Sequence, residues 1–150
     1  MKTARTSPAR QAKELFIEYL AAHGLRFTRQ RLLVLDHLLS SGKHQSTDAI
    51  YQTLRRQGVG RATVFRNLKM LAKCGIISNI RDPKGISNFE VTHNRPHHDH
   101  LICIKCDAIH EVRWPELERI QQRICRKTGF EPRWHRHEIF GVCARCRKAR

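Results

Sequence analysis

The stretch His97-His98-Asp99-His100-Leu101-Ile102-Cys103-Ile104-Lys105-Cys106 places three imidazoles, a carboxylate and two thiols within ten consecutive residues. Such a density of nitrogen, oxygen and sulfur ligands is typical of metal binding. In an extended strand the side chains alternate between two faces, so His98 and His100 point to one side and His97 and Asp99 to the other. This one strand is therefore expected to supply ligands to two or three separate sites.

A second pair of cysteines, Cys143 and Cys146, follows Cys106 after 36 intervening residues. With Cys103 and Cys106 it forms two C-x-x-C pairs, which is the pattern of a closed, tetrahedral zinc site. The spacing therefore predicts a structural zinc that joins the start of the C-terminal part of the chain to its end.

The chain of 150 residues is strongly basic, with a formal net charge of +16. Both parts share the excess, because residues 1–94 hold 16 Lys and Arg against 6 Asp and Glu, and residues 95–150 hold 13 against 7. A charge of this size suits a polyanionic partner, and nucleic acid is the commonest one. A generally basic, well-solvated surface would have the same composition, so the motifs must decide.

The chain lacks the apolar segment of a signal peptide, and no apolar run approaches the roughly 18 residues of a membrane span. We therefore expect a cytoplasmic protein with no membrane partner. In that reducing compartment, cysteines are metal ligands more often than disulfide partners. Cys74 and Cys125, which lie outside the two pairs, fall in apolar helical patterns and are interpreted as small core residues.

The first part of the chain has a helical period that later gives way to strand alternation. Helices are expected over residues 12–23, 29–39, 48–57 and 61–74. Two strands, residues 76–81 and 86–91, follow around the turn Asp82-Pro83-Lys84-Gly85. Helices followed by a hairpin are the order of a winged helix, whose last helix enters the major groove of DNA while the hairpin touches phosphate.

The second part of the chain begins after a polar segment, residues 93–96, that ends in a proline and is interpreted as a hinge. Beyond it we expect strands over residues 98–104 and 109–112 and a last strand over residues 131–142. Between them we expect a helix from Pro115 to about residue 127, with Leu117, Ile120 and Ile124 inward. So small an α/β unit has exposed strand edges, and pairing with a second copy is expected.

Four motifs resemble those of the ferric uptake regulator (Fur) family, and the resemblance covers nearly the whole chain. They are Leu25-Arg26-Phe27-Thr28-Arg29-Gln30-Arg31, Ala62-Thr63-Val64-Phe65-Arg66-Asn67-Leu68, His97-His98-Asp99-His100-Leu101-Ile102-Cys103 and Cys143-Ala144-Arg145-Cys146. The resemblance implies a dimeric, metal-sensing repressor that binds double-stranded DNA and is not an enzyme. Its α+β fold would be a winged-helix DNA-binding domain over residues 1–92, a hinge over 93–96 and a small α/β dimerisation domain with the four-cysteine zinc over 97–150.

The resemblance also implies a role for individual residues. Structural zinc would be held by Cys103, Cys106, Cys143 and Cys146. A regulatory metal at the hinge would be held by His44, Glu90, His98, His100 and Glu111. An additional metal would be held by His97, Asp99, Glu118 and His135, although His137 alternates onto the same strand face as His135 and either could be the ligand. The residues expected on DNA are Arg61, Thr63, Phe65, Arg66, Asn67 and Lys84.

Three residues bear on the subtype within the family. Asp107 stands where many members have glycine, which alters a turn. Phe65 stands where many have tyrosine, which removes a hydroxyl but keeps an apolar ring able to meet a thymine methyl. Glu111 stands where peroxide-sensing members tend to carry aspartate, which favours a sensor of metal availability.

The sensed metal is left open by this pattern, because nitrogen and oxygen ligands accept several divalent ions. Fe(II) is favoured, with Zn(II) close behind and Mn(II) possible, and a zinc-uptake or peroxide-responsive regulator is the alternative within the family. Two other classes were weighed. A zinc hydrolase or deaminase would need a motif such as His-Glu-x-x-His, which the chain lacks, and an RNA-binding zinc ribbon would need stacking aromatics, for which Trp114 and Trp134 are the candidates.

Overall fold

The structure, a computed structural model, describes residues 7–149 and divides into two compact units. Unit 1 ends at Arg95 and unit 2 begins at Pro96. Each unit contains its own three-stranded sheet. Within residues 7–149, every helix is too short or too polar to cross a lipid bilayer.

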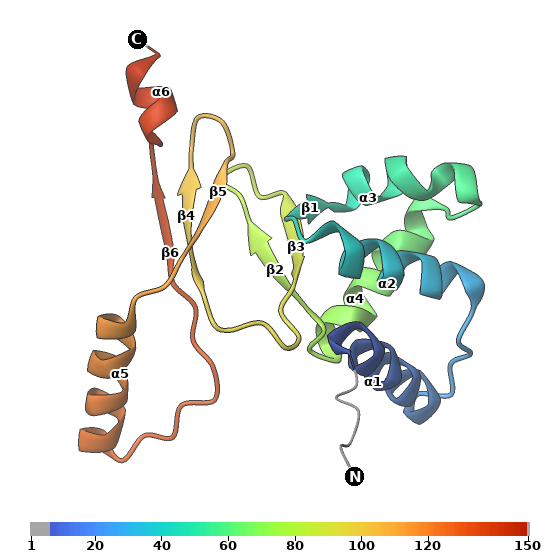
Figure 1. Ribbon diagram of the computed structural model, residues 1–150, viewed down its shortest axis with the longest axis horizontal. Coiled ribbons are helices and arrows are strands. Elements are labelled where there is room, and N and C mark those ends of the chain that lie inside the picture. The colour runs from blue at the N-terminus through green and yellow to red at the C-terminus, as the bar shows by residue number, and fades with distance from the viewer. Residues whose placement is uncertain (1–6, 150) are drawn as a thin grey trace. The chain divides into compact units, whose positions relative to one another are not determined.

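Unit 1 consists of helices followed by a β-hairpin (Figure 1), as the sequence predicts. Its elements are α1 (Pro8–Ala22), α2 (Arg29–Ser41), β1 (Gln45–Ser46), α3 (Thr47–Leu54), the 3₁₀ turn η1 (Arg55–Gln57), α4 (Arg61–Lys73), β2 (Ile77–Arg81) and β3 (Ser87–Val91). The side chains of Ser7, Thr28 and Ser46 each accept a hydrogen bond from a backbone N–H of the first turn of a helix. The first helix begins at Pro8, earlier than predicted, because Ser7 caps it and proline suits the first turn.

The helices of unit 1 share one apolar core with the hairpin. Phe16 of α1, Leu35 of α2 and Leu68 of α4 are each fully buried and belong to a cluster that also includes Phe89 of β3. Burying a side chain of this size contributes about 1.5–3 kcal/mol. This core therefore holds α4 against the other helices and leaves its opposite face toward solvent.

The hairpin of unit 1 forms an antiparallel sheet in the order β1-β3-β2. Its turn is closed by the buried carboxylate of Asp82, whose Oδ1 accepts hydrogen bonds from the backbone N–H groups of Lys84 and Ile86, both at 2.9 Å. Gly85 has a φ of +79°, a conformation that glycine adopts without strain. This turn presents Lys84 at the exposed tip of the hairpin.

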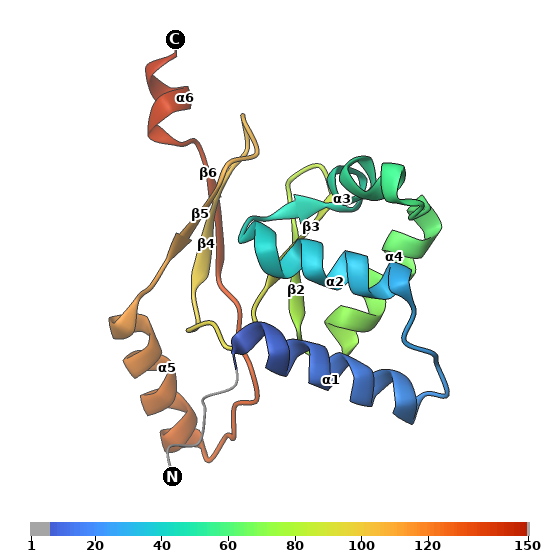
Figure 2. The same cartoon turned by 45° about the vertical axis from the view of Figure 1, so that its right-hand side comes forward.

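Unit 2 is a small sheet with a helix at either end (Figures 1 and 2). Its elements are β4 (Asp99–Cys103), β5 (Ile109–Val112), α5 (Pro115–Thr128), β6 (Glu138–Gly141) and α6 (Ala144–Lys148). The central strand β4 pairs antiparallel with β5 and parallel with β6. The parallel pairing requires a crossover, which α5 supplies between β5 and β6.

Two predictions for unit 2 were wrong in detail. The strand predicted over residues 131–142 is confined to Glu138–Gly141, because Pro132 has no backbone N–H and the N–H of His137 bonds a side chain, Asp99 Oδ1, at 3.3 Å. The short helix α6 was not predicted, since five residues are too few to show a helical period.

The outward face of α5 also differs from the prediction. Ile120 and Ile124 were expected inward, yet they are 43% and 54% exposed in this single chain. Among the described residues of unit 2, the buried apolar side chains are Ile102 and Cys103 alone. Unit 2 therefore has almost no apolar core of its own.

Candidate metal centres and DNA-binding surface

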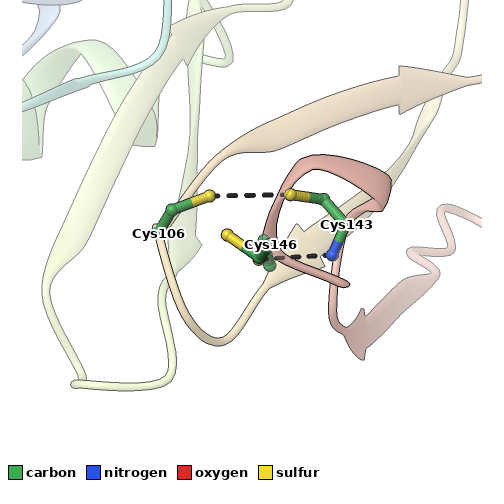
Figure 3. Close-up of side chains that lie close together, drawn as sticks. Cys106, Cys143 and Cys146 are labelled. Atoms are coloured by element: carbon green, nitrogen blue, oxygen red, sulfur yellow. Dashed lines mark hydrogen bonds between the residues drawn. The ribbon is translucent and has the colours of Figure 1, made fainter. Parts of the chain in front are cut away.

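Four cysteines converge at the end of unit 2 that carries α6. Cys103 ends β4, Cys106 follows in a turn, Cys143 precedes α6 and Cys146 lies within it. Their sulfurs all lie within 4.8 Å of one another, and Figure 3 shows the thiols of Cys106, Cys143 and Cys146 pointing toward a common centre. The sulfurs of Cys106 and Cys143 are 3.8 Å apart. Zinc bonded to four sulfurs at about 2.3 Å places them about 3.8 Å apart, so the cluster fits this ion.

The turn between the first two cysteines explains one feature of the sequence. Asp107 has a φ of +57°, and its backbone N–H donates to the carbonyl oxygen of Cys103 at 3.0 Å. Glycine adopts this left-handed conformation freely, while aspartate is among the few other residues that tolerate it. Asp107 therefore preserves the turn that Cys103 and Cys106 require.

The thiols of the cluster strongly affect one another. A hydrogen bond from the backbone N–H of Cys143 lowers the pKa of Cys103 to about 6. Hydrogen bonds to Cys106 and Cys143 raise the pKa of Cys146 to about 12. A dication at this centre would hold the four sulfurs as thiolates. The net negative charge of such a complex would be offset by the basic residues of α6, Arg145, Arg147 and Lys148.

A second cluster lies beside α5 and contains His97, Glu118 and His135, whose ligand atoms lie within 4.8 Å of one another. His135 Nε2 is 2.9 Å from Glu118 Oε1, and His97 Nε2 is 3.5 Å from the same oxygen. Asp99 Oδ1 lies 3.1 Å from His97 Nε2. The carboxylate of Asp99 is buried, and its Oδ2 has no hydrogen-bond partner among the described residues. A buried, unpartnered carboxylate oxygen beside two imidazoles fits a divalent ion.

Contacts in the same region distinguish His135 from His137, either of which could be the metal ligand by sequence alone. His135 contacts Glu118, whereas His137 Nε2 lies 2.6 Å from Nε2 of Gln121. His135 thus belongs to the cluster, and His137 is bonded to a neutral amide outside it. Gln121 was missed by the sequence analysis, because an amide on an exposed helix carries no metal-binding signal.

The residues predicted to hold the regulatory metal form one group in each unit. In unit 1, His44 Nε2 lies 3.2 Å from Glu90 Oε2, and Ser78 Oγ donates to Glu90 Oε1 at 3.0 Å. The short strand β1 beside His44 pairs with β3, which carries Glu90, and so brings the two together.

In unit 2, the rings of His98 and His100 are 5.1 Å apart, and His98 Nε2 lies 3.8 Å from Glu111 Oε1. Glu111 on β5 pairs directly with His100 on β4. His98 Nδ1 lies 3.1 Å from the carbonyl oxygen of Pro96. A hydrogen bond from Nδ1 to that carbonyl directs the lone pair to Nε2, which is how metal-binding histidines are commonly oriented.

The predicted DNA-binding residues lie on α4 and in the hairpin turn. Arg61, Phe65 and Arg66 are exposed, and Lys69 Nζ lies 4.5 Å from the centre of the Phe65 ring. Arg61 also forms a 2.5 Å ion pair with Asp48 of α3. Thr63 is half-buried.

Asn67 does not fit the base-contacting role predicted for it. Its side chain is 2% exposed, and its amide N–H donates to the carbonyl oxygen of Thr63 at 2.7 Å. The reason is helical geometry: Asn67 shares the inward face of α4 with Val64, Leu68 and Leu71, which the core buries.

A basic hollow of about 580 Å³ adjoins α4. Its cationic lining residues are Arg26, Arg31, Arg66 and Lys69. Arg26 and Arg31 belong to the loop before α2 and to α2 itself, and they were not among the predicted DNA contacts. The signal that could have found them was the run of basic residues over 26–31.

The chain is similar to proteins of known function over almost its full length. The sequence model of the Ferric uptake regulator family matches residues 22–140. A ferric uptake regulation protein of Campylobacter jejuni is 34% identical over 89% of this chain and 87% of its own length, and a peroxide-responsive repressor of Staphylococcus epidermidis is 35% identical over 88% of each. The solved structure of the Helicobacter pylori ferric uptake regulator, described as having three functional metal binding sites, is 29% identical with a TM-score of 0.83 and covers 98% of this chain and 97% of its own.

Proposed function

The chain belongs to the ferric uptake regulator family, and we propose that it is a homodimeric repressor that binds operator DNA when a divalent ion joins its two domains. Members of this family are metal-responsive transcriptional regulators rather than enzymes, so a zinc hydrolase or deaminase is not retained. We place its action in the cytoplasm, as the sequence predicts.

The observation that carries the proposal is the division of the nitrogen and oxygen ligands between the two units. His44 and Glu90 form a pair in unit 1, and His98, His100 and Glu111 form a group in unit 2. We assign the DNA-binding domain to residues 1–92, the hinge to 93–96 and the dimerisation domain to 97–150. A single ion bound by both groups would fix the orientation of the two domains.

Fixed domains matter because a dimer reads two half-sites. In a symmetric dimer the orientation of each DNA-binding domain sets the distance between two recognition helices, which must match half-sites about 34 Å apart. Without metal, the hinge would sample many distances, and each mismatch would weaken operator binding. The ion acts through its preference for the matching arrangement.

The exposed apolar side chains of unit 2 support a homodimer. Ile120, Ile124, Ile139 and Phe140 are each more than 40% exposed, and Trp134 is 83% exposed. A folded unit rarely leaves so many large apolar groups in water unless a partner covers them. A second copy of unit 2 that covers such side chains would provide the apolar core that the single chain lacks.

The exposed face of α4 supports contact with double-stranded DNA. Arg61, Phe65 and Arg66 would lie nearest the bases, and the basic hollow beside them would adjoin phosphates. Lys84 at the hairpin tip would contact phosphate as well.

Replacing Arg66 with alanine is expected to reduce the preference for operator over unrelated DNA, because a side-chain contact with a base edge contributes about 1–3 kcal/mol of discrimination. Lys84→Ala should weaken binding to all sequences alike, and it should reduce the slope of log affinity against log salt concentration by about one unit. Fluorescence anisotropy would measure both, on an operator selected from random DNA and on a scrambled duplex, at several salt concentrations. Lys127→Ala, which removes a charge from unit 2, is the matched control. Unchanged selectivity of the Arg66→Ala protein would contradict the placement of α4 in the major groove.

The sensed metal is proposed to be Fe(II). Imidazole and carboxylate ligands accept Fe(II), Mn(II) and Zn(II), so cellular supply contributes to the choice, and Glu111 favours a sensor of metal availability. The test reloads protein that keeps its cysteine-bound zinc with each metal separately under anaerobic conditions. Stimulation of operator binding by Fe(II), at the free Fe(II) concentration that a cell maintains, would support the proposal. Stimulation by Zn(II) alone, or loss of binding on exposure to peroxide, would favour the zinc-uptake or peroxide-responsive alternative.

The additional site is proposed to be held by His97, Asp99, Glu118 and His135. His135→Ala should then lower the affinity of this site for divalent metal by at least about tenfold, because changes even to groups behind the ligands cost 10–100-fold. His137→Leu, at the neighbouring histidine, should leave the metal bound. Both substitutions would be made in the His98→Ala protein, so that the additional site is measured by itself. Metal content after dialysis against buffered metal would then show which histidine is a ligand. Equal losses in both proteins would make His137 a ligand too.

A further inference from the structure

His137 is bonded to three residues of unit 2, two on β4 and one on α5. Its backbone N–H donates to Asp99 Oδ1 at 3.3 Å, and its carbonyl oxygen accepts from the backbone N–H of His100 at 3.2 Å. Its ring is held by Gln121 of α5 at 2.6 Å. One residue thus joins a ligand of the additional site, the strand of the regulatory ligands and a helix.

The partners of His137 lie on the same two elements as ligands of the proposed sites. Asp99 and His100 are adjacent on β4, so their side chains face opposite sides of the sheet. Glu118 and Gln121 are three residues apart on α5 and share one helix face. The segment before β6 likewise carries His135 toward Glu118 and His137 toward Gln121.

We infer that His137 couples the additional metal site to β4, the strand that carries His100 and directly follows His98, with Gln121 as the positioning residue; this inference rests on the proposed function. A metal at the additional site would hold His135 and Glu118 in this arrangement, which keeps His137 against Gln121. The main chain of His137 then holds Asp99 on one side and the N–H of His100 on the other.

The element that responds is the start of the pairing between β4 and β6. The first pair of the two strands is His100 with Glu138, and the hydrogen bond from His100 N–H to the carbonyl oxygen of His137 lies at this end of the pairing. The end of such a ladder opens more easily than its centre. A metal at the additional site would order this end of the β4–β6 pairing. The regulatory ligands would then lose less conformational entropy when they bind their own ion. Metal at the additional site should therefore raise the affinity of the regulatory site for its ion. By linkage, metal at the regulatory site should raise the affinity of the additional site by the same factor.

The first test measures hydrogen exchange by mass spectrometry in the full-length dimer carrying His98→Ala, which removes a regulatory ligand. Zn(II) added to this protein should slow exchange of the peptide that contains His100. Gln121→Leu and, as a second variant, His137→Leu should keep Zn(II) at the additional site but lose most of that slowing. Gln122→Leu, the same substitution at the exposed neighbour, is the control. Because the readout is the difference made by metal, a loss of basal stability alone would not change it.

The second test measures affinity in chains with all regulatory ligands. Glu118→Gln should raise the free metal needed to half-saturate the regulatory site by about 5-fold or more, as expected for coupled sites. Gln121→Leu should raise it similarly, and the double variant should add little. Equal slowing by Zn(II) in the Gln121→Leu and Gln122→Leu proteins would overturn the coupling while leaving the proposed function intact. Full metal response of operator binding in the His98→Ala protein would overturn the proposed function, whereas the exchange result would still report on the coupling.

Discussion

Replacing Cys143 with serine should release zinc and unfold unit 2, leaving a monomer with a folded unit 1. Structural zinc bound by thiolates contributes about 10–16 kcal/mol of apparent free energy at neutral pH, as much as the whole stability of an ordinary domain. Unit 2 has little else to replace it, because its buried apolar residues, as far as Ala149, are Ile102 and Cys103. Unit 1 keeps its own core and should retain its helical circular dichroism.

The measurements are zinc content per chain and sedimentation equilibrium. Cys125→Ser is the control, since Cys125 is a half-buried cysteine of α5 outside the cluster and its loss should alter neither quantity. A Cys143→Ser protein that stays dimeric with a full complement of zinc would remove the structural role assigned to the four cysteines.

Replacing His98 with alanine should leave a folded, zinc-containing dimer that no longer binds operator in response to metal. A shift of the domains from mostly open to mostly closed, from 1:99 to 99:1, needs about 5.5 kcal/mol of differential binding. Several ligands acting together can provide it, and removing one is expected to cost at least about tenfold in metal affinity. At the free metal concentration that half-saturates the parent protein, operator binding by the variant should therefore fall toward its metal-free level.

Fluorescence anisotropy at buffered free metal would measure this response. His110→Ala is the matched control, because His110 is an exposed histidine on the neighbouring strand β5 that belongs to none of the proposed sites. Full retention of the metal response by the His98→Ala protein would show that sensing takes place elsewhere in the chain.

Several features were predictable from the sequence because their determinants are local. The helical periods and the Asp82-Pro83-Lys84-Gly85 turn each act within a few residues, and the structure has the predicted helices and hairpin. The two C-x-x-C pairs were equally informative, since each pair at this spacing can supply two of the four ligands of a tetrahedral ion. Strand alternation separated His98 and His100 from Asp99 in the same way.

Other features depended on contacts between distant residues and only the tertiary structure decided them. Asn67 reads as a DNA contact in its motif, but the core around Val64 and Leu68 turns it inward. His135 and His137 are equivalent by alternation, yet Glu118 and Gln121 distinguish them across 16 or 17 residues of sequence. The last strand starts only at Glu138 because Asp99, 38 residues away from His137, accepts the N–H of that residue. The sequence by itself thus determined the elements and the ligand types, because periodicity and spacing are local, whereas the role of each side chain was decided by the partners that folding brings to it.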